Sequence, residues 1–71
     1  MEYVRVSFVT GDVRDVIANG NVVGSTETEL ALPANYYVIS LSGAGYAPSH
    51  RYVLVSGTSP AQPLPIRFDR A

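Results

Sequence analysis

Turn-forming residues interrupt this chain about every 8 to 12 residues, and that spacing limits the elements it can form. No window keeps the i, i+3, i+4, i+7 apolar spacing of an amphipathic helix free of glycine, proline or clustered β-branched residues. The runs between the turns are rich in valine, leucine and tyrosine, and several alternate apolar with polar residues. Because successive side chains of a strand point to opposite faces, the pattern predicts an all-β fold.

Seven runs have strand character, at residues 3–9, 13–18, 21–23, 27–32, 36–41, 51–55 and 63–68. The first shows the pattern well, with Val4, Val6 and Phe8 on one face and polar residues between them. We therefore expect residues 1–71 to form one domain, a small antiparallel β-sandwich of about seven short strands.

The turns and one edge also have sequence signatures. Asn19-Gly20 joins two runs, and both residues tolerate the positive φ angles of a type I′ hairpin turn. Asn35, the last residue of the turn Pro33-Ala34-Asn35, is expected in the left-handed conformation. Pro63 and Pro65 both lack an N–H on the same side of the last run, so this strand is expected at a sheet edge, blunted against further pairing.

The size of the chain restricts its stability. A chain of 71 residues buries only about 60% of the surface that its unfolded form exposes. Small domains often need a disulfide, a metal or a partner subunit to offset the entropy of ordering the chain. No cysteine is present, so neither a disulfide nor a thiolate metal site can form. A partner subunit would supply the missing support.

Charge is low and dispersed. Five arginines, no lysine and six acids give a net charge of −1, without the basic stripe that nucleic-acid binding requires. No apolar run approaches the ~20 residues of a membrane span, and the N-terminus has the pattern of a strand, not of a secretory signal. We expect neither nucleic-acid binding nor membrane insertion. The expected location is cytoplasmic for a complete protein and the cell surface for a module of a longer one.

No catalytic, cofactor-binding or metal-binding residue is expected. His50 is the only histidine, and no nucleophile-elbow motif places it with Ser49 and Asp69 in a triad. Asp12 and Asp15 are too few acids for a calcium loop. The sequence therefore predicts a protein that is not an enzyme.

A series of turn and core positions occurs along residues 13–68 in an order known from one family. These positions are Val16, Asn19-Gly20, Val22-Val23-Gly24, Thr26, Leu30-Ala31-Leu32-Pro33-Ala34, Tyr37, Ile39, Leu41, Gly45-Tyr46, Val53 and Val55. In this order the chain resembles the PEGA domain, a small β-sandwich module of bacterial and archaeal proteins, many of them at the cell surface. The resemblance implies a module without catalytic residues that acts as a spacer or an interaction unit.

Two features depart from that family. The Pro-Glu-Gly-Ala tetrapeptide is absent from residues 11–14, where it would fall, and the usual glycine after the proline turn is Asn35. Transthyretin-like and Cna-B-type domains are related alternatives. The lysine–asparagine isopeptide bond of many Cna-B domains cannot form in a chain without lysine.

The run 36–41, YYVISL, is apolar on both sides, unlike a surface strand with one solvated face. If Tyr37 and its alternate residues face the core, the side chains left on the other face of this run and of 51–55 are Tyr36, Val38, Tyr52 and Leu54. Tyrosine suits protein interfaces because it joins a large apolar body to a polar tip. These four residues are the expected interaction surface, covered in a homo-oligomer and most simply in a dimer.

Two functional classes remain open. The first is a structural or protein-interaction module that self-associates through this surface. The second is a carbohydrate-binding module that stacks sugars on exposed tyrosines. A sugar platform needs coplanar rings flanked by polar groups, whereas Val38 and Leu54 supply the aliphatic filler of a protein interface. The sequence therefore favours the interaction module.

Overall fold

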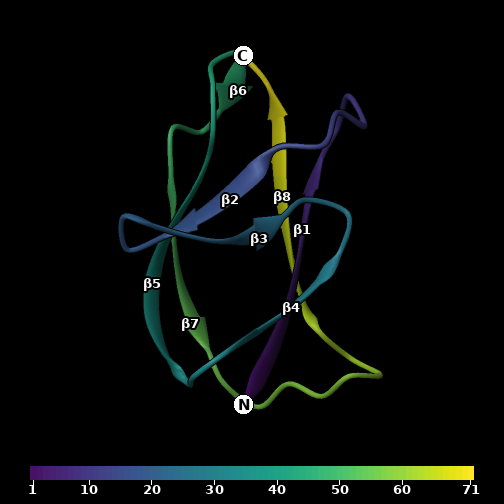
Figure 1. Cartoon of the computed structure of the whole chain (residues 1–71), viewed down its shortest axis with the longest axis vertical. Helices are drawn as coiled ribbons and strands as arrows, with labels where there is room; N and C mark the ends of the chain where they lie inside the picture. Colours follow the sequence, from purple (N-terminus) through teal and green to yellow (C-terminus); the bar gives the residue numbers. More distant parts are fainter.

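The computed structural model describes all 71 residues, and the chain forms eight strands and no helix (Figure 1). The strands are β1 (Glu2–Phe8), β2 (Asp15–Ala18), β3 (Asn21–Ser25), β4 (Glu29–Leu32), β5 (Asn35–Leu41), β6 (Tyr46–Ala47), β7 (Arg51–Val55) and β8 (Leu64–Arg70). The all-β prediction is confirmed. The additional strand is β6, two residues long, in a segment that the sequence indicates as a loop.

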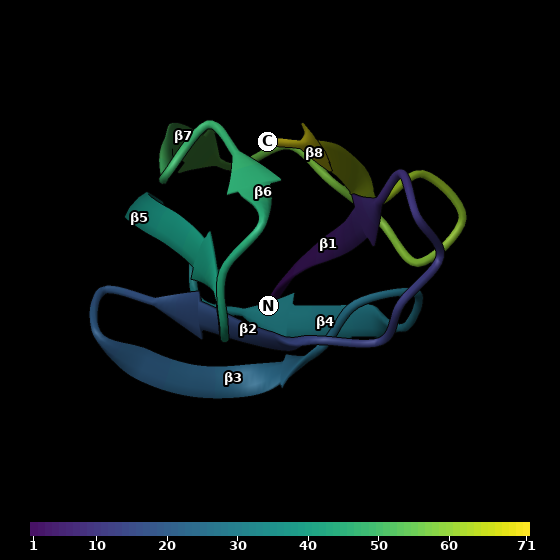
Figure 2. The same ribbon diagram turned by 90° about the horizontal axis from the view of Figure 1, so that it is seen from above.

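The strands form two four-stranded sheets, and Figure 2 shows from above that they surround a common interior. The first, called the β1 sheet, has the order β4-β1-β8-β6, and the second, called the β5 sheet, has the order β3-β2-β5-β7. Neighbouring strands are antiparallel except β1 and β8, which are parallel. The structure thus confirms the small β-sandwich and adds one parallel pair between the first and last strands of the chain.

The core between the sheets is built from alternate residues of the strands. Val4, Val6 and Phe8 of β1 are buried, as their alternation predicts. The full buried apolar cluster is Val4, Val6, Phe8, Val16, Ala18, Leu30, Leu32, Tyr37, Ile39, Leu41, Val55, Ile66 and Phe68. Both sheets contribute to this cluster, so each sheet covers the apolar inner face of the other.

The hairpin turn at Asn19-Gly20 joins β2 to β3 as predicted. Asn19 has φ 50° and Gly20 has φ 85°, the pair of positive angles that a type I′ turn requires. The Asn19 side chain also binds β5, because its Oδ1 accepts a hydrogen bond from the Val38 N–H at 2.9 Å. Its Nδ2 donates to the Tyr36 carbonyl at 3.4 Å. The turn is therefore fastened to the neighbouring strand.

The prediction of a left-handed Asn35 is wrong. Asn35 begins β5 without a positive φ, and its Oδ1 accepts a hydrogen bond from the next N–H at 2.8 Å. The left-handed residue is instead Glu27, at φ 64°, so the strand expected at residues 27–32 begins only at Glu29. The Glu27 N–H donates to the Val6 carbonyl at 2.8 Å, and Arg5 Nη2 donates to the Glu27 carbonyl at 3.0 Å. These hydrogen bonds hold the turn in place.

β8 is an edge strand over only part of its length. It lies between β1 and β6, but β6 pairs only with its last residues, Asp69 and Arg70. The Phe68 carbonyl accepts a hydrogen bond from Val9 on the β1 side, so Pro65, an odd number of residues away, faces the side that β6 leaves open. The blunted edge predicted for residues 63–68 therefore holds on the side that Pro65 faces. β8 continues beyond that run to Arg70, and there β6 covers the edge.

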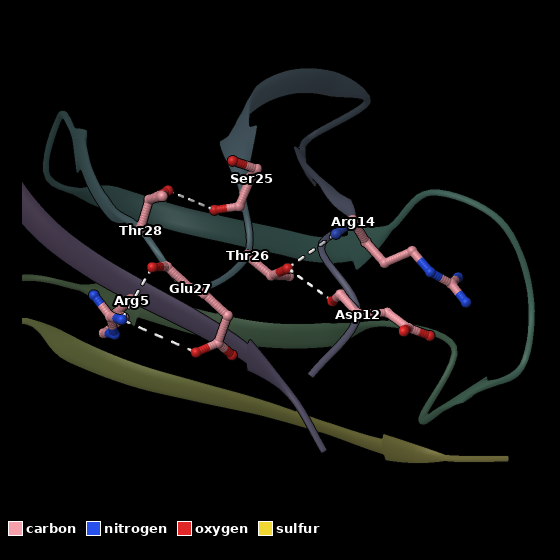
Figure 3. A network of polar contacts seen from close by, with 7 residues as sticks. All are labelled: Arg5, Asp12, Arg14, Ser25, Thr26, Glu27 and Thr28. Carbon is pink, nitrogen blue, oxygen red and sulfur yellow. Dashed lines mark hydrogen bonds and ion pairs between the residues drawn. The ribbon is translucent and has the colours of Figure 1, made fainter. Parts of the chain in front are cut away.

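The connection from β3 to β4 crosses from one sheet to the other and is fastened by Thr26, the one buried polar side chain. Thr26 Oγ1 accepts a hydrogen bond from the Arg14 N–H at 2.9 Å and donates to the Asp12 carbonyl at 3.3 Å (Figure 3). The Thr26 N–H donates to the Arg14 carbonyl at 2.8 Å. The segment that enters β2 is thus held against the crossing.

Replacing the hydroxyl of Thr26 tests this fastening. Thr26→Val keeps the shape of the side chain but leaves the Arg14 N–H and the Asp12 carbonyl without their partner. We expect the free energy of unfolding to fall by about 1 to 3 kcal/mol, measured by urea denaturation. Thr26→Ser, which retains the hydroxyl, should lose less. A valine variant as stable as the wild type would contradict this account.

Gly24 of β3 leaves no room for a larger residue, because a Cβ there would meet Leu30 Cδ2 of β4. Leu30 is buried, so it cannot simply turn into solvent. We expect Gly24→Ala to lower the free energy of unfolding by about 1 to 3 kcal/mol in urea denaturation. Combining it with Leu30→Ala removes the obstructing methyl groups, so the double variant should cost less than the sum of the two single variants. Simple additivity would show that the two positions do not clash.

Candidate interaction surface

The outer face of the β5 sheet carries the four residues that the sequence indicates. β5 and β7 pair antiparallel, with Tyr36 opposite Leu54 and Val38 opposite Tyr52. Residues directly opposite one another share a face of the sheet, so the four side chains lie together. Tyr36 is 70% exposed, Tyr52 78% and Leu54 50%, while Val38 is half-buried.

The same face continues over β2 and β3 through two residues that sequence reasoning missed. Ile17 of β2 lies opposite Ser40 of β5 and opposite Val22 of β3, which is largely exposed. A signal for this pair was present, because a two-residue turn at Asn19-Gly20 places Ile17 opposite Val22. We define the apolar face as Ile17, Val22, Tyr36, Val38, Tyr52 and Leu54.

The outer face of the β1 sheet has the opposite character. Arg5 of β1 lies opposite Glu29 of β4, and Ser7 lies opposite Arg67 of β8. Polar outward residues alternating with buried apolar ones are typical of a sheet with one solvated face. The β1 sheet therefore presents charged residues on its outer face, whereas the middle of β5 and β7 presents tyrosine, valine and leucine.

Two further tyrosines have structural contacts. The hydroxyl of Tyr37, a buried residue, donates to the Pro33 carbonyl at 2.6 Å. The hydroxyl of Tyr46 donates to the Leu41 carbonyl at 2.8 Å, and its ring meets Phe68 edge-on with centroids 5.5 Å apart. The exposed rings of the apolar face, in contrast, have no ring of the core against them.

The residues considered for a catalytic triad are not assembled. Ser49 Oγ lies 3.1 Å from His50 Nδ1, and the imidazole meets the Tyr52 ring edge-on at 5.4 Å between centroids. Asp69 is instead paired with Arg67, with 3.3 Å between Oδ1 and Nε. His50 therefore lies at the rim of the apolar face, next to one of its tyrosines.

Two arginines bind loops and strands of the chain itself. Arg14 Nη1 donates to the carbonyls of Ser42 and Ala44, at 2.8 and 3.0 Å, and so closes the loop before β6. Arg51 Nε donates to the Arg67 carbonyl at 2.6 Å and so joins β7 to β8 of the other sheet. These guanidinium groups serve the fold.

No pocket opens on the surface, and no three acidic or histidine side chains are grouped to hold a metal ion. The structure contains no helix that could cross a membrane. No protein-family model, curated protein or solved structure matches this chain.

A polar cluster at the start of β1 perturbs the titration of Glu2. Glu2 Oε1 accepts hydrogen bonds from the N–H and the hydroxyl of Thr58, both at 2.8 Å. Thr58 Oγ1 in turn accepts one from the Tyr3 N–H at 2.6 Å. The two hydrogen bonds from Thr58 favour the carboxylate and hold the pKa of Glu2 below its ordinary value. The cluster fastens the loop before β8 to β1.

Protonation of Glu2 should weaken this attachment. Because the pKa of Glu2 is lower in the folded than in the unfolded chain, its stabilisation is complete above the ordinary carboxyl pKa and is lost as the pH falls through the lowered value. We expect Glu2→Gln to lower the thermal unfolding midpoint at neutral pH, and the difference from wild type to shrink below about pH 4. Glu29→Gln, at an exposed acid without a hydrogen-bond partner, is the control. A difference that is the same at every pH would contradict this role of Glu2.

Proposed function

We propose that this chain is a non-catalytic structural or protein-interaction module that self-associates through its apolar face. The observation that carries the proposal is the register of β5 and β7, which sets Tyr36 beside Leu54 and Val38 beside Tyr52 on a solvent-facing surface. Large contiguous apolar patches on small soluble domains mark interaction sites. On the outer face of the β1 sheet, Tyr3 and Ala31 adjoin the charged pair Arg5 and Glu29 instead of further apolar residues.

The size and chemistry of the face suit a second copy of the same face. Two copies packed face to face would bury on the order of 1,000 Å², close to the lower limit for a specific interface. None of the six side chains carries a charge, so the contact buries no unpaired ion. A two-fold axis uses the same patch twice and closes the assembly as a dimer. Burial of this face also supplements the thin core of each copy.

We also propose that this chain is related to the PEGA domain, which it resembles in sequence. The buried positions Tyr37, Ile39 and Leu41 and the confirmed Asn19-Gly20 turn support it. Modules of that family act as spacers or interaction units, which agrees with a face that is available for contact. On this reading the chain has a bacterial or archaeal source.

A carbohydrate-binding module is the second candidate, and the exposure of Tyr36 and Tyr52 favours it. The two rings occupy diagonal positions, since each lies opposite an aliphatic residue of the other strand. Val38 and Leu54 therefore fill the places where a sugar platform would carry polar hydrogen-bonding groups. A glycan array separates the two candidates, because saturable binding that Tyr36→Ala abolishes would support the second.

Solution mass tests self-association directly. We expect light scattering to show a dimer that dissociates on dilution through the micromolar range. Tyr36→Arg, which puts a charge at an exposed position of the face beside Leu54, should weaken the dimer by about tenfold or more. Val13→Arg, at an exposed apolar residue of the loop before β2, is the matched control and should change nothing.

Two results would contradict the proposal. One is a monomer at every concentration. The other is a dimer that Val13→Arg weakens as much as Tyr36→Arg does, because the apolar face would then have no special part in the contact.

A further inference from the structure

β7 is the last strand of the β5 sheet, so one of its sides has no neighbour. The direction of its main-chain groups follows from β5. The N–H and carbonyl of Val38 both bond to Asn19 on the β2 side, so the adjacent residue Tyr37 directs its own groups at β7. Val53, directly opposite Tyr37, therefore bonds back to β5.

Tyr52 and Leu54 flank Val53 and consequently point their N–H and carbonyl groups to the open side. No hydrogen bond of the chain reaches these four groups. The same two residues carry exposed side chains of the apolar face. Free main-chain groups and apolar side chains thus coincide on a regular stretch of strand.

Every other edge of the two sheets has a feature that hinders further pairing. A bulge interrupts β3 opposite Val16 and Ile17. β4 has four residues and carries the exposed Glu29, and β6 has only two residues. The open half of β8 contains Pro65, and Arg51 occupies a main-chain carbonyl farther along it. β7 has five residues, no proline and no bulge, and its only charge, that of Arg51, is directed at the other sheet.

We propose that β7 pairs antiparallel with β7 of a second copy, about a two-fold axis at Val53. In this register Tyr52 lies opposite Leu54 of the second copy, and Leu54 lies opposite its Tyr52. The outward N–H and carbonyl groups then satisfy one another in two hydrogen-bonded pairs, four hydrogen bonds in all. The two Val53 residues face each other as a non-hydrogen-bonded pair.

The symmetry of β7 is the reason for naming a second copy as the occupant. The free groups are placed evenly on either side of Val53, so the strand complements itself without a shift of register. The side chains match as well, since each Tyr52 ring lies beside a Leu54 side chain on the outer face. The product is a continuous eight-stranded sheet whose apolar faces adjoin.

The inference goes beyond the proposed function, because it concerns the main-chain edge of β7. Packing of the apolar face on another copy and pairing at the edge use different atoms. Each can therefore hold or fail without the other. The face alone gives the dimer described above, and both contacts together give an assembly larger than a dimer.

Cysteine cross-linking tests the register. The chain has no cysteine of its own, and the Cα atoms of a non-hydrogen-bonded pair lie about 4.5 Å apart, within reach of a disulfide. We expect Val53→Cys to form a covalent dimer on mild oxidation. Tyr52→Cys is the matched variant, because its two thiols would be offset by two residues, with Cα atoms about 8 Å apart and too far for easy bridging.

The expected order of rates is the reverse of the order of exposure. Tyr52 is 78% exposed and Val53 is half-buried, so random collision of thiols would cross-link Tyr52→Cys faster. Edge pairing predicts that Val53→Cys is faster by about tenfold or more, because the pairing holds its thiols together. The proposal is overturned if Tyr52→Cys cross-links faster than Val53→Cys, or if the Val53→Cys chain stays monomeric. The second result would also leave the edge open to an extended peptide.

A proline at position 54 tests the hydrogen bonds. Leu54→Pro removes an N–H that points to the open side, so no hydrogen bond within the chain is lost. Added to Val53→Cys, it should reduce the covalent dimer to the level of Tyr52→Cys, with circular dichroism confirming the fold. Unchanged cross-linking in a folded double variant would contradict edge pairing. If the proline variant does not fold, the cross-linking rates of the two cysteine variants still decide whether β7 pairs in the proposed register.

The face and the edge are separated by Tyr36→Arg, since Tyr36 lies on β5 and not at the edge. In the Val53→Cys background this change should leave cross-linking intact. If Val53→Cys fails to cross-link while the wild-type dimer remains sensitive to Tyr36→Arg, the edge inference is wrong and the proposed function stands. If Val53→Cys cross-links and Tyr36→Arg does not change the solution mass, the edge inference stands and the proposed function is wrong.

Discussion

The pairing of β5 with β7 on one side and with β2 on the other governs the arrangement of the rest of this molecule. Its register sends Tyr37, Ile39 and Leu41 into the core and leaves Tyr36 and Val38 on the outside. A slip of one residue would exchange the two sets, because side chains alternate between faces. The outer set is nearly as apolar as the inner one, so burial of apolar side chains favours the observed register over the slipped one only weakly. Asn19, bonded to Val38 through main chain and side chain, helps to secure the register.

This register also links the two surfaces that we propose as contacts. Tyr52 and Leu54 present their side chains on the apolar face and their main-chain groups at the open edge. A small domain without disulfides has a thin core, and contact with a second copy adds apolar burial at about 25 cal/mol per Å². Tyr52 and Leu54, which a single copy leaves exposed, are thus the residues through which we propose that two copies associate.

Local patterns in the sequence were sufficient for much of the fold. Alternation identified the core residues of β1 and β5, and Asn19-Gly20 identified its hairpin. The parallel pairing of β1 with β8 joins opposite ends of the chain, and no local pattern encodes it. The left-handed Glu27 was missed because hydrogen bonds from Arg5 and to Val6, distant in sequence, hold it. In the candidate surface, four residues followed from alternation, whereas Ile17 and Val22 required the pairing that the turn dictates.

The most direct test of the central claim, that the apolar face is a contact surface between copies, is a dilution series followed by amide NMR. We predict that chemical shifts change with protein concentration along β5 and β7 and at Ile17 and Val22, on the outer side of the β5 sheet. The outer residues of the β1 sheet, such as Arg5 and Ser7, should keep constant shifts. Spectra that do not depend on concentration, or changes confined to the β1 sheet, would contradict the claim.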